Sequence, residues 1–367
     1  MENFDYDLQS VQEARNLARL GKIATDKLAD YTEEQIDKIL QNMVRVAEEN
    51  AVMLAKMAVE ETGFGKVEDK TYKNHMASTI VYNYIKDMKC SGIIHEDPVN
   101  KMMEVADPVG LIMGIVPSTN PTSTAIYKSM IAIKARNAIV FSPHPSALQC
   151  TLKAATLMRD AAVAAGAPEN VIGCLSMPSM GATDELMKCK ETSMIIATGG
   201  PGMVKAAYSA GKPALGVGAG NSPSYIERTA DVAQSVKEIL ASKTFDNGTV
   251  CASEQSVICE ECNRDQVIAE FKKQGGYFMT AEETAKVCNL LFKNGGHSMS
   301  AKFVGRSAQV IATAAGISIP DGTRVLIGEQ QGVGDGYPLS YEKLTTVLAF
   351  YTVRDWHEAC ELSIKLL

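Results

Sequence analysis

Apolar positions divide the chain into a helical first part and an alternating second part. Over the first hundred residues they recur every three or four positions, as in amphipathic helices. The helices that this spacing predicts are Leu8–Ala29, Ile36–Val46, Met53–Val59 and Tyr72–Met88. Thr32 and Gln35 form a capping-box pattern before the second helix, and Gly63 and Gly65 end the third.

From Val105 onward, short apolar runs alternate with helical stretches. The predicted strands are Val109–Val116, Ala138–Phe141, Val171–Leu175 and Met194–Ala197, and the predicted helices between them are Thr122–Arg136, Leu148–Ala165 and Ala182–Met187. This order predicts an α/β fold with a doubly wound parallel sheet. Such sheets bind ligands beyond the carboxyl ends of their strands. The loops of interest are therefore Pro117–Asn120, Ser142–Pro145 and Thr198–Gly202.

A second region begins near Gly220. Its predicted elements are the helices Ser235–Ser242, Gln266–Phe271, Thr284–Phe292 and Trp356–Leu367, the strand Val257–Cys259 and the turn Phe245–Gly248. Because the last helix stops on apolar residues, we expect the sequence to be a fragment of a longer chain.

Composition narrows the class of protein. A chain of 367 residues suits two domains, and 46% apolar with 22% charged residues is an ordinary globular balance. The net charge of −7 argues against nucleic acid as a partner. No apolar run is long enough to span a membrane, and the first residues lack a secretory-signal pattern. Nine scattered cysteines are expected to be reduced thiols in the cytoplasm.

The glycine-rich segments each allow two interpretations. The dinucleotide fingerprint Gly-x-Gly-x-x-Gly is absent, and Gly216-x-Gly218-x-Gly220 begins no obvious helix. The loop Thr198–Gly202 joins a strand to a helix, so its backbone N–H groups could bind a phosphate. Alternatively it is a tight turn that needs glycines with positive φ.

Three side chains are candidates for chemistry. Cys251 follows a glycine turn and is either a nucleophile or a buried core cysteine. Asn120 follows a strand and either donates to an oxyanion or is a turn-forming or helix-capping residue. Glu342 either binds sugar hydroxyls or is a solvated surface residue. Cys259-x-x-Cys262 has no second cysteine pair and the histidines are isolated, so we expect no metal site.

Five segments together resemble the CoA-acylating aldehyde dehydrogenases, and most of all the aldehyde dehydrogenase half of bifunctional aldehyde–alcohol dehydrogenases. In chain order these segments are Ile115–Ile126, Phe141–Pro145, Thr198–Val204, Gly216–Asn221 and Phe245–Glu254. The resemblance covers nearly the whole chain.

The resemblance implies an aldehyde dehydrogenase-like fold with a Rossmann-type nucleotide-binding domain. Residues 1–220 would form the NAD-binding domain with its N-terminal helical region, and residues 221–367 an α/β catalytic domain that is incomplete at its C-terminal end. Cys251 is the implied nucleophile and Asn120 the implied oxyanion donor. The implied cofactor contacts are Pro117, Ser118, Thr119, Asn120, His144, Gly199, Gly200, Gly218 and Glu342. A homo-oligomer is implied for the full-length protein.

The implied reaction converts a short aldehyde, CoA and NAD⁺ reversibly to acyl-CoA and NADH, with acetaldehyde or propionaldehyde as the expected substrate. Hydrolytic relatives carry a glutamate, which activates water, where this chain has Val217. Ser142 replaces their ribose-binding lysine, and we expect NAD rather than NADP. The alternatives are an acylating sulfoacetaldehyde dehydrogenase, a hydrolytic aldehyde dehydrogenase and a non-catalytic nucleotide-binding paralogue. The expected location is the cytoplasm, and a bacterial microcompartment within the cytoplasm is the alternative.

Overall fold

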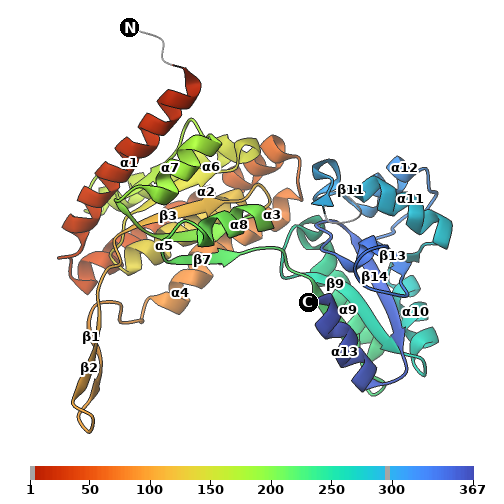
Figure 1. Ribbon diagram of the computed structural model, residues 1–367. Coiled ribbons are helices and arrows are strands. Elements are labelled where there is room, and N and C mark those ends of the chain that lie inside the picture. Colours follow the sequence, from red (N-terminus) through yellow and green to blue (C-terminus); the bar gives the residue numbers. More distant parts are fainter. Residues whose placement is uncertain (1–4, 294–297) are drawn as a thin grey trace. The chain divides into compact units, whose positions relative to one another are not determined.

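The computed structural model describes residues 5–293 and 298–367, which form two compact units (Figure 1). The first unit extends to Gly63 and resumes over Val67–Gly218, and the second comprises Phe64–Lys66 and Ala219–Leu367. Which part of the reaction each unit performs stays a prediction.

The first unit has helices on a parallel sheet, with a separate two-stranded hairpin. Its helices are α1 (Tyr6–Leu28), α2 (Glu33–Thr62), α3 (Val67–His75), α4 (Val81–Ile85), α5 (Pro121–Lys134), α6 (Leu148–Ala164), α7 (Met180–Lys188) and α8 (Pro201–Tyr208). Its strands are β1 (Gly92–Asp97), β2 (Met102–Ala106), β3 (Leu111–Val116), β4 (Ile139–Pro143), β5 (Ile172–Cys174), β6 (Thr192–Thr198) and β7 (Ala214–Val217).

The sheet of this unit has the order β5-β4-β3-β6-β7, and every pairing is parallel. The chain steps outward from β3 to β5 and then returns to the other side of β3. This order is 3-2-1-4-5, which matches five of the six strands of a Rossmann fold, with the switch point between β3 and β6. All six residues of β3 are buried, as expected of a central strand covered by helices on both faces. The predicted doubly wound sheet is thus confirmed.

A buried lysine joins the two strands at the switch point. Lys128 lies on α5, is fully buried, and donates to the backbone oxygens of Ile115 on β3 (2.7 Å) and Ile196 on β6 (2.9 Å). Burial lowers the pKa of this amine to about 7.

The structure corrects two predicted helix boundaries in this unit. A single helix, α2, replaces the predicted pair, because the buried Ala47 and Ala51 continue its apolar face. The capping box at Thr32 is confirmed, and Gly63 ends the helix with φ 70°. The helix predicted from Tyr72 begins earlier, at Val67, and contains a π-helical turn, η1 (Met76–Ile80), before α4.

The antiparallel hairpin β1–β2 lies outside every predicted element. Figure 1 shows it projecting away from the rest of the first unit. Its apolar side chains stay exposed; Val99 is 87% accessible, Met103 64% and Val105 62%. An exposed apolar hairpin of this kind is a feature of surfaces that meet another protein chain.

The second unit has another five-stranded parallel sheet, in the order β10-β13-β14-β9-β8. Its strands are β8 (Ser222–Ile226), β9 (Glu254–Glu260), β10 (Gly276–Phe278), β13 (Val325–Glu329) and β14 (Val347–Val353), and a small pair is formed by β11 (Phe292–Lys293) and β12 (Ser298–Met299). Its helices are α9 (Val232–Thr244), α10 (Arg264–Lys273), α11 (Ala281–Leu291), α12 (Ala308–Ala315) and α13 (Trp356–Leu366).

Three aromatic rings pack edge to face between α10, β10 and β14, with centroids 5.2–6.5 Å apart. They belong to Phe271, Phe278 and Phe350. Strands β8, β10, β13 and β14 and helix α12 lie outside the predicted elements. Cys259 ends up buried in β9 and Cys262 exposed in the following turn, as expected of a strand end and loop. Among the described helices, none combines the length and apolar character that crossing a membrane requires.

Candidate active site

A cavity of about 370 Å³ opens beyond the carboxyl ends of β3, β4 and β6 in the first unit. It is lined by Ile115, Val116, Pro117, Ser142, Pro143, His144, Pro145, Pro178, Ser179, Met180, Thr183, Thr198, Gly199, Gly200 and Met203. Four of the predicted cofactor contacts, Pro117, His144, Gly199 and Gly200, therefore meet in one hollow at the switch point of the sheet. This is where a doubly wound sheet binds its ligand.

The loop from β6 to α8 contains no glycine in a left-handed conformation. Gly200 is the N-cap residue of α8 with φ −66°, and Gly199 is not among the residues with positive φ. The tight-turn interpretation is therefore wrong. A Cβ on Gly200 would meet no atom within 4 Å, so glycine here keeps open space in front of a helix N-terminus. Within the described structure, the Thr198 hydroxyl is buried in this loop without a hydrogen-bond partner.

These features fit a dinucleotide. The hollow is mostly apolar, with proline and methionine side chains that can pack on a purine ring, and it has a helix N-terminus for phosphate. The unpartnered Thr198 hydroxyl adds a polar group that a ligand can satisfy. On the opposite wall, Ser142 is buried and its hydroxyl lies 2.9 Å from that of Thr183.

The β3–α5 loop carries Ser118, Thr119 and Asn120, all half-buried. Asn120 occupies the N-cap position of α5, yet its side chain makes no capping hydrogen bond, so the helix-capping interpretation is wrong. Instead its Oδ1 accepts from the Lys73 ammonium at 2.6 Å. Lys70 donates to the Thr119 carbonyl at 2.8 Å.

The α3 residues that hold this loop were not among the residues predicted from the sequence. Lys70, Lys73 and Asn74 are buried, and their spacing of three and four places them on one face of α3. Asn74 accepts a hydrogen bond from the Thr122 hydroxyl at 2.8 Å. The signal in the sequence was two lysines and an asparagine on a single helical face.

Cys251 belongs to the second unit and lies between η3 (Phe245–Gly248) and β9. Three consecutive residues before it, Asp246, Asn247 and Gly248, have φ of 49°, 51° and 78°. Such conformations are costly for non-glycine residues and persist only where the surroundings hold them. The Asp246 carboxylate does so by accepting from the Lys66 backbone N–H (2.8 Å) and the Thr249 hydroxyl (2.6 Å). Cys251 itself is partly exposed rather than a buried core residue.

Gly220 brings Cys251 and Glu342 together within the second unit. Its N–H donates to Glu342 Oε1 at 3.0 Å, and a Cβ placed on it would lie 1.8 Å from the Cys251 carbonyl oxygen. Only glycine permits this approach. Glu342 is half-buried rather than solvated. Burial raises the pKa of its carboxyl, while the Gly220 N–H and the nearby Lys243 and Lys343 act in the opposite direction.

A second buried lysine supports the segment that carries Glu342. Lys243 on α9 is fully buried and donates to Gln255 Oε1 (2.9 Å) and to the Lys343 carbonyl (2.8 Å). Gln255 Oε1 also accepts from the Lys343 N–H at 2.9 Å. Both backbone polar groups of Lys343 are therefore held, and the adjacent Glu342 is fixed with them. Burial lowers the pKa of Lys243 to about 7.

Gly218 and Val217 are not among the residues that line the cavity of the first unit, although the Val217 carbonyl accepts from the Gly199 N–H at 3.2 Å beside it. Val217 ends β7 with 51% of its surface exposed, and it offers no carboxylate. Gly218 is the last residue of the first unit, and a Cβ there would have its nearest neighbour at 4.0 Å.

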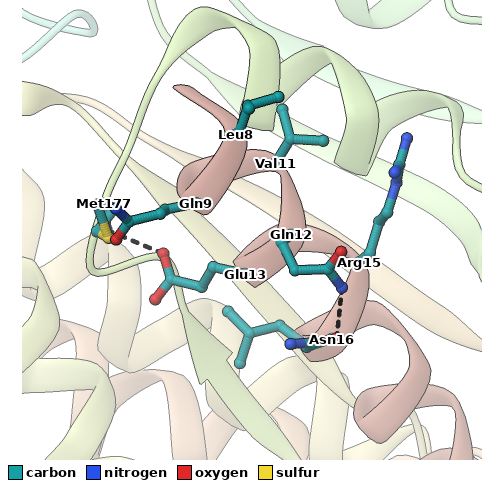
Figure 2. Close-up of a pocket in the computed structure, with 9 residues that line it drawn as sticks. Leu8, Gln9, Val11, Gln12, Glu13, Arg15, Asn16 and Met177 are labelled. Carbon is teal, nitrogen blue, oxygen red and sulfur yellow. Dashed lines mark hydrogen bonds between the residues drawn. The ribbon is translucent and has the colours of Figure 1, made fainter. Parts of the chain in front are cut away.

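A larger hollow of about 670 Å³ follows α1 and is lined by Leu8, Gln9, Val11, Gln12, Glu13, Arg15, Asn16, Leu17 and Met177. Figure 2 shows Glu13 turned toward the backbone of Met177. The Glu13 carboxylate accepts a hydrogen bond from the Met177 N–H at 2.9 Å. Its other carboxylate oxygen accepts from the Ser176 N–H, so this acid is a structural anchor. The hollow contains no predicted site residue and no nucleophile. In the part of the chain that the structure describes, no group of three His, Cys, Asp or Glu side chains is arranged to hold a metal ion.

The chain belongs to the aldehyde dehydrogenase family. The family model, described as the aldehyde dehydrogenase family, matches residues 5–281. The sheet of the first unit and the segment around Cys251 both lie inside the matched range.

Three proteins whose names include an aldehyde dehydrogenase are similar to this chain over nearly its whole length. An acetylating aldehyde dehydrogenase from Geobacillus thermoglucosidasius is 55% identical, with a TM-score of 0.96 over 100% of this chain and 80% of that one. A bifunctional aldehyde-alcohol dehydrogenase of Escherichia coli is 48% identical over 98% of this chain, which spans only 40% of that relative's length. A propionaldehyde dehydrogenase from Rhodopseudomonas palustris, solved with bound CoA and an acylated cysteine, is 28% identical, with a TM-score of 0.86 over 96% of this chain and 80% of that one.

Proposed function

We propose that this chain is the catalytic part of a CoA-acylating aldehyde dehydrogenase that interconverts a short aldehyde, CoA and NAD⁺ with acyl-CoA and NADH. The observation that carries the proposal is the partly exposed Cys251, on a loop built from three left-handed residues, in a chain 55% identical to an acetylating aldehyde dehydrogenase. Acetaldehyde and propionaldehyde are the proposed substrates.

The hollow of the first unit is the proposed site for NAD. Pro117, His144, Gly199 and Gly200 would hold the nucleotide, with the N-terminus of α8 facing a phosphate. The proposal gives Ser118, Thr119, Gly218 and Glu342 further contacts to the cofactor, Glu342 holding a ribose hydroxyl pair through its carboxylate. When bound, NAD supplies the acceptor for the hydride that the substrate loses.

In the proposed mechanism, Cys251 acts as the nucleophile. Its thiolate adds to the aldehyde carbon and gives a thiohemiacetal, whose oxyanion receives a hydrogen bond from the Asn120 amide. Loss of hydride leaves an acyl thioester on Cys251. The CoA thiolate then attacks the acyl carbon, the bond to the Cys251 sulfur breaks, and the enzyme thiolate is regenerated. This is a ping-pong sequence with one covalent intermediate.

Val217 favours transfer of the acyl group to CoA rather than to water. Hydrolysis of a thioester at neutral pH needs a general base, because water is a weak nucleophile. A valine at this position supplies no base. A thiol with an ordinary pKa near 8.5 ionises in part at neutral pH, so CoA needs less activation than water does.

The same proposal includes a cellular location and a state of assembly. All nine cysteines are free thiols, which suits a reducing cytoplasm. The exposed apolar side chains of the β1–β2 hairpin suit contact with a second copy, and a homo-oligomer is proposed for the full-length protein.

The experiment is a rate measurement on this chain. NADH formation from NAD⁺ and propionaldehyde is followed with and without CoA, for the wild type and for Cys251→Ala. CoA-dependent NADH formation that disappears in Cys251→Ala is the expected result. Equal rates without CoA would instead establish a hydrolytic enzyme, and sulfoacetaldehyde as the better substrate would reassign the aldehyde.

A further inference from the structure

Three side chains of α3 hold the loop that carries Asn120. Lys70 donates to the Thr119 carbonyl (2.8 Å), Lys73 donates to Asn120 Oδ1 (2.6 Å), and the Thr122 hydroxyl donates to Asn74 Oδ1 (2.8 Å). Lys73 is 8% exposed, Lys70 3% and Asn74 0%, so these are built contacts rather than surface ion pairs.

Lys73 contacts the side chain of Asn120 itself, whereas Lys70 contacts the backbone carbonyl of the preceding residue, Thr119. A carboxamide has an oxygen that only accepts and a nitrogen that only donates, and a half-turn about its last bond exchanges them. An ammonium group has three donors and no acceptor. The Asn120 amide can therefore face Lys73 with Oδ1 alone, and Nδ2 points away from Lys73 and donates to the Thr119 hydroxyl at 3.2 Å. A hydroxyl can donate as well as accept, so the Thr119 contact does not fix which end of the amide faces it, whereas the Lys73 contact does.

We propose, on the basis of the function proposed above, that Lys73 is a positioning residue that keeps the Asn120 amide oriented with Nδ2 as the donor to the reacting oxygen. The role of Asn120 requires an N–H donor, and an amide turned by half a revolution would present an acceptor to a developing oxyanion. The charge of Lys73 also polarises the amide, which strengthens Nδ2–H as a donor. Lys73 acts through Asn120 and does not itself touch the substrate.

The remaining contacts make this role separable from folding. If Lys73 loses its ammonium, Lys70 and Asn74 still tie the loop to α3. The loop should keep its backbone course, while the Asn120 amide loses the contact that can be made only by Oδ1. A deficit in the chemical step, with cofactor affinity retained, is the signature of that change.

The test compares Lys73→Met and Lys73→Gln with the wild type. A glutamine retains an N–H donor for Asn120 Oδ1, so it should restore part of the activity that methionine removes. Lys212→Met is the matched control, because Lys212 donates to the Thr192 carbonyl at 2.6 Å in the same unit but does not contact the β3–α5 loop. Each variant is also made in an Asn120→Ala background.

Removing an oxyanion donor lowers kcat by about 100- to 1,000-fold, and misorienting one should lower it by a part of that. For Lys73→Met we expect a fall of about 10- to 100-fold in kcat, with the KM for NAD⁺ within about twofold. In the Asn120→Ala background the same change should lower kcat by less than about twofold, since the group through which Lys73 acts is gone. Lys212→Met should match the wild type.

An unchanged kcat in Lys73→Met overturns the proposal, and so does an equal loss in both backgrounds, which would indicate a structural role. A second readout needs no turnover. In protein labelled with ¹⁵N-asparagine, the Asn120 side-chain signal is identified by its loss in Asn120→Ala, and it should shift and broaden in Lys73→Met. If it stays in place, the proposal is wrong. A wild type without CoA-dependent activity would overturn the proposed function, and the labelled signal would still decide the role of Lys73.

Discussion

Gly220 is the residue whose substitution tests the geometry around Cys251 most severely. In Gly220→Ala the new Cβ would lie 1.8 Å from the Cys251 carbonyl oxygen and 2.8 Å from its carbonyl carbon, where real Cβ contacts essentially never fall below 3.0 Å. Both contacts are to backbone, so no side chain can rotate away. The chain must separate by more than about 1 Å, at a cost of about 1–3 kcal/mol in overpacking.

The separation also strains the hydrogen bond from the Gly220 N–H to Glu342. A displacement of about 1 Å in a catalytic group lowers rates by about 100-fold, and we expect a loss of that order in kcat. The assay is CoA-dependent NADH formation, with urea unfolding for stability and the rate of iodoacetamide alkylation at Cys251 for the position of the thiol. Gly181→Ala is the control, because its Cβ would make an ordinary contact at 3.5 Å. If Gly220→Ala has the kcat and alkylation rate of the wild type, the close approach of Gly220 does not position Cys251.

Three further predictions concern stability and cofactor affinity. Thr32→Ala removes the capping box of α2 and should lower the free energy of unfolding by about 1 kcal/mol, measured with urea; no loss would show that the cap is redundant. Lys128 has a folded-state pKa of about 7 and an unfolded-state pKa of about 10.4, so between these values the unfolded chain binds the proton and the folded chain does not. Stability should therefore rise from about pH 7 to about pH 10 in the wild type relative to Lys128→Met, by up to about 1.4 kcal/mol per pH unit, and parallel profiles would contradict this. Lys243→Met frees the segment that carries Glu342 and should raise the KM for NAD⁺ more than it lowers kcat; an unchanged KM would exclude this support.

The parallel sheet of the first unit could be predicted because its signal is local. Strand β3 is apolar along its whole length and ends at Pro117, and β4 and β6 follow at the spacing of strand–helix units. Glycines after β6 mark the loop that the structure places at the cavity. These features depend on the spacing of apolar residues and on the glycine and proline residues of turns, both of which can be seen in a single sequence.

Other features depend on distant residues and could not be predicted in this way. The helix α2 continues through Ala47 and Ala51. Alanine is only weakly apolar, so in the sequence these positions interrupt the apolar pattern, and their burial is known only from the fold. In the sequence alone, Lys73 is an ordinary charged residue of a helix. Only the fold brings it into contact with Asn120, 47 positions away. Gly220 lies 31 positions from Cys251, and its requirement for glycine comes from a backbone contact that no motif records.

The central claim is that Cys251 carries the acyl group. The direct measurement is mass spectrometry of this chain after incubation with propionyl-CoA, with the peptide that contains Cys251 analysed in the wild type and in Cys251→Ala. We expect one propionyl group on Cys251, removed when CoA is added in excess and absent from the variant. Acylation of another cysteine, or equal labelling of the variant, would contradict it.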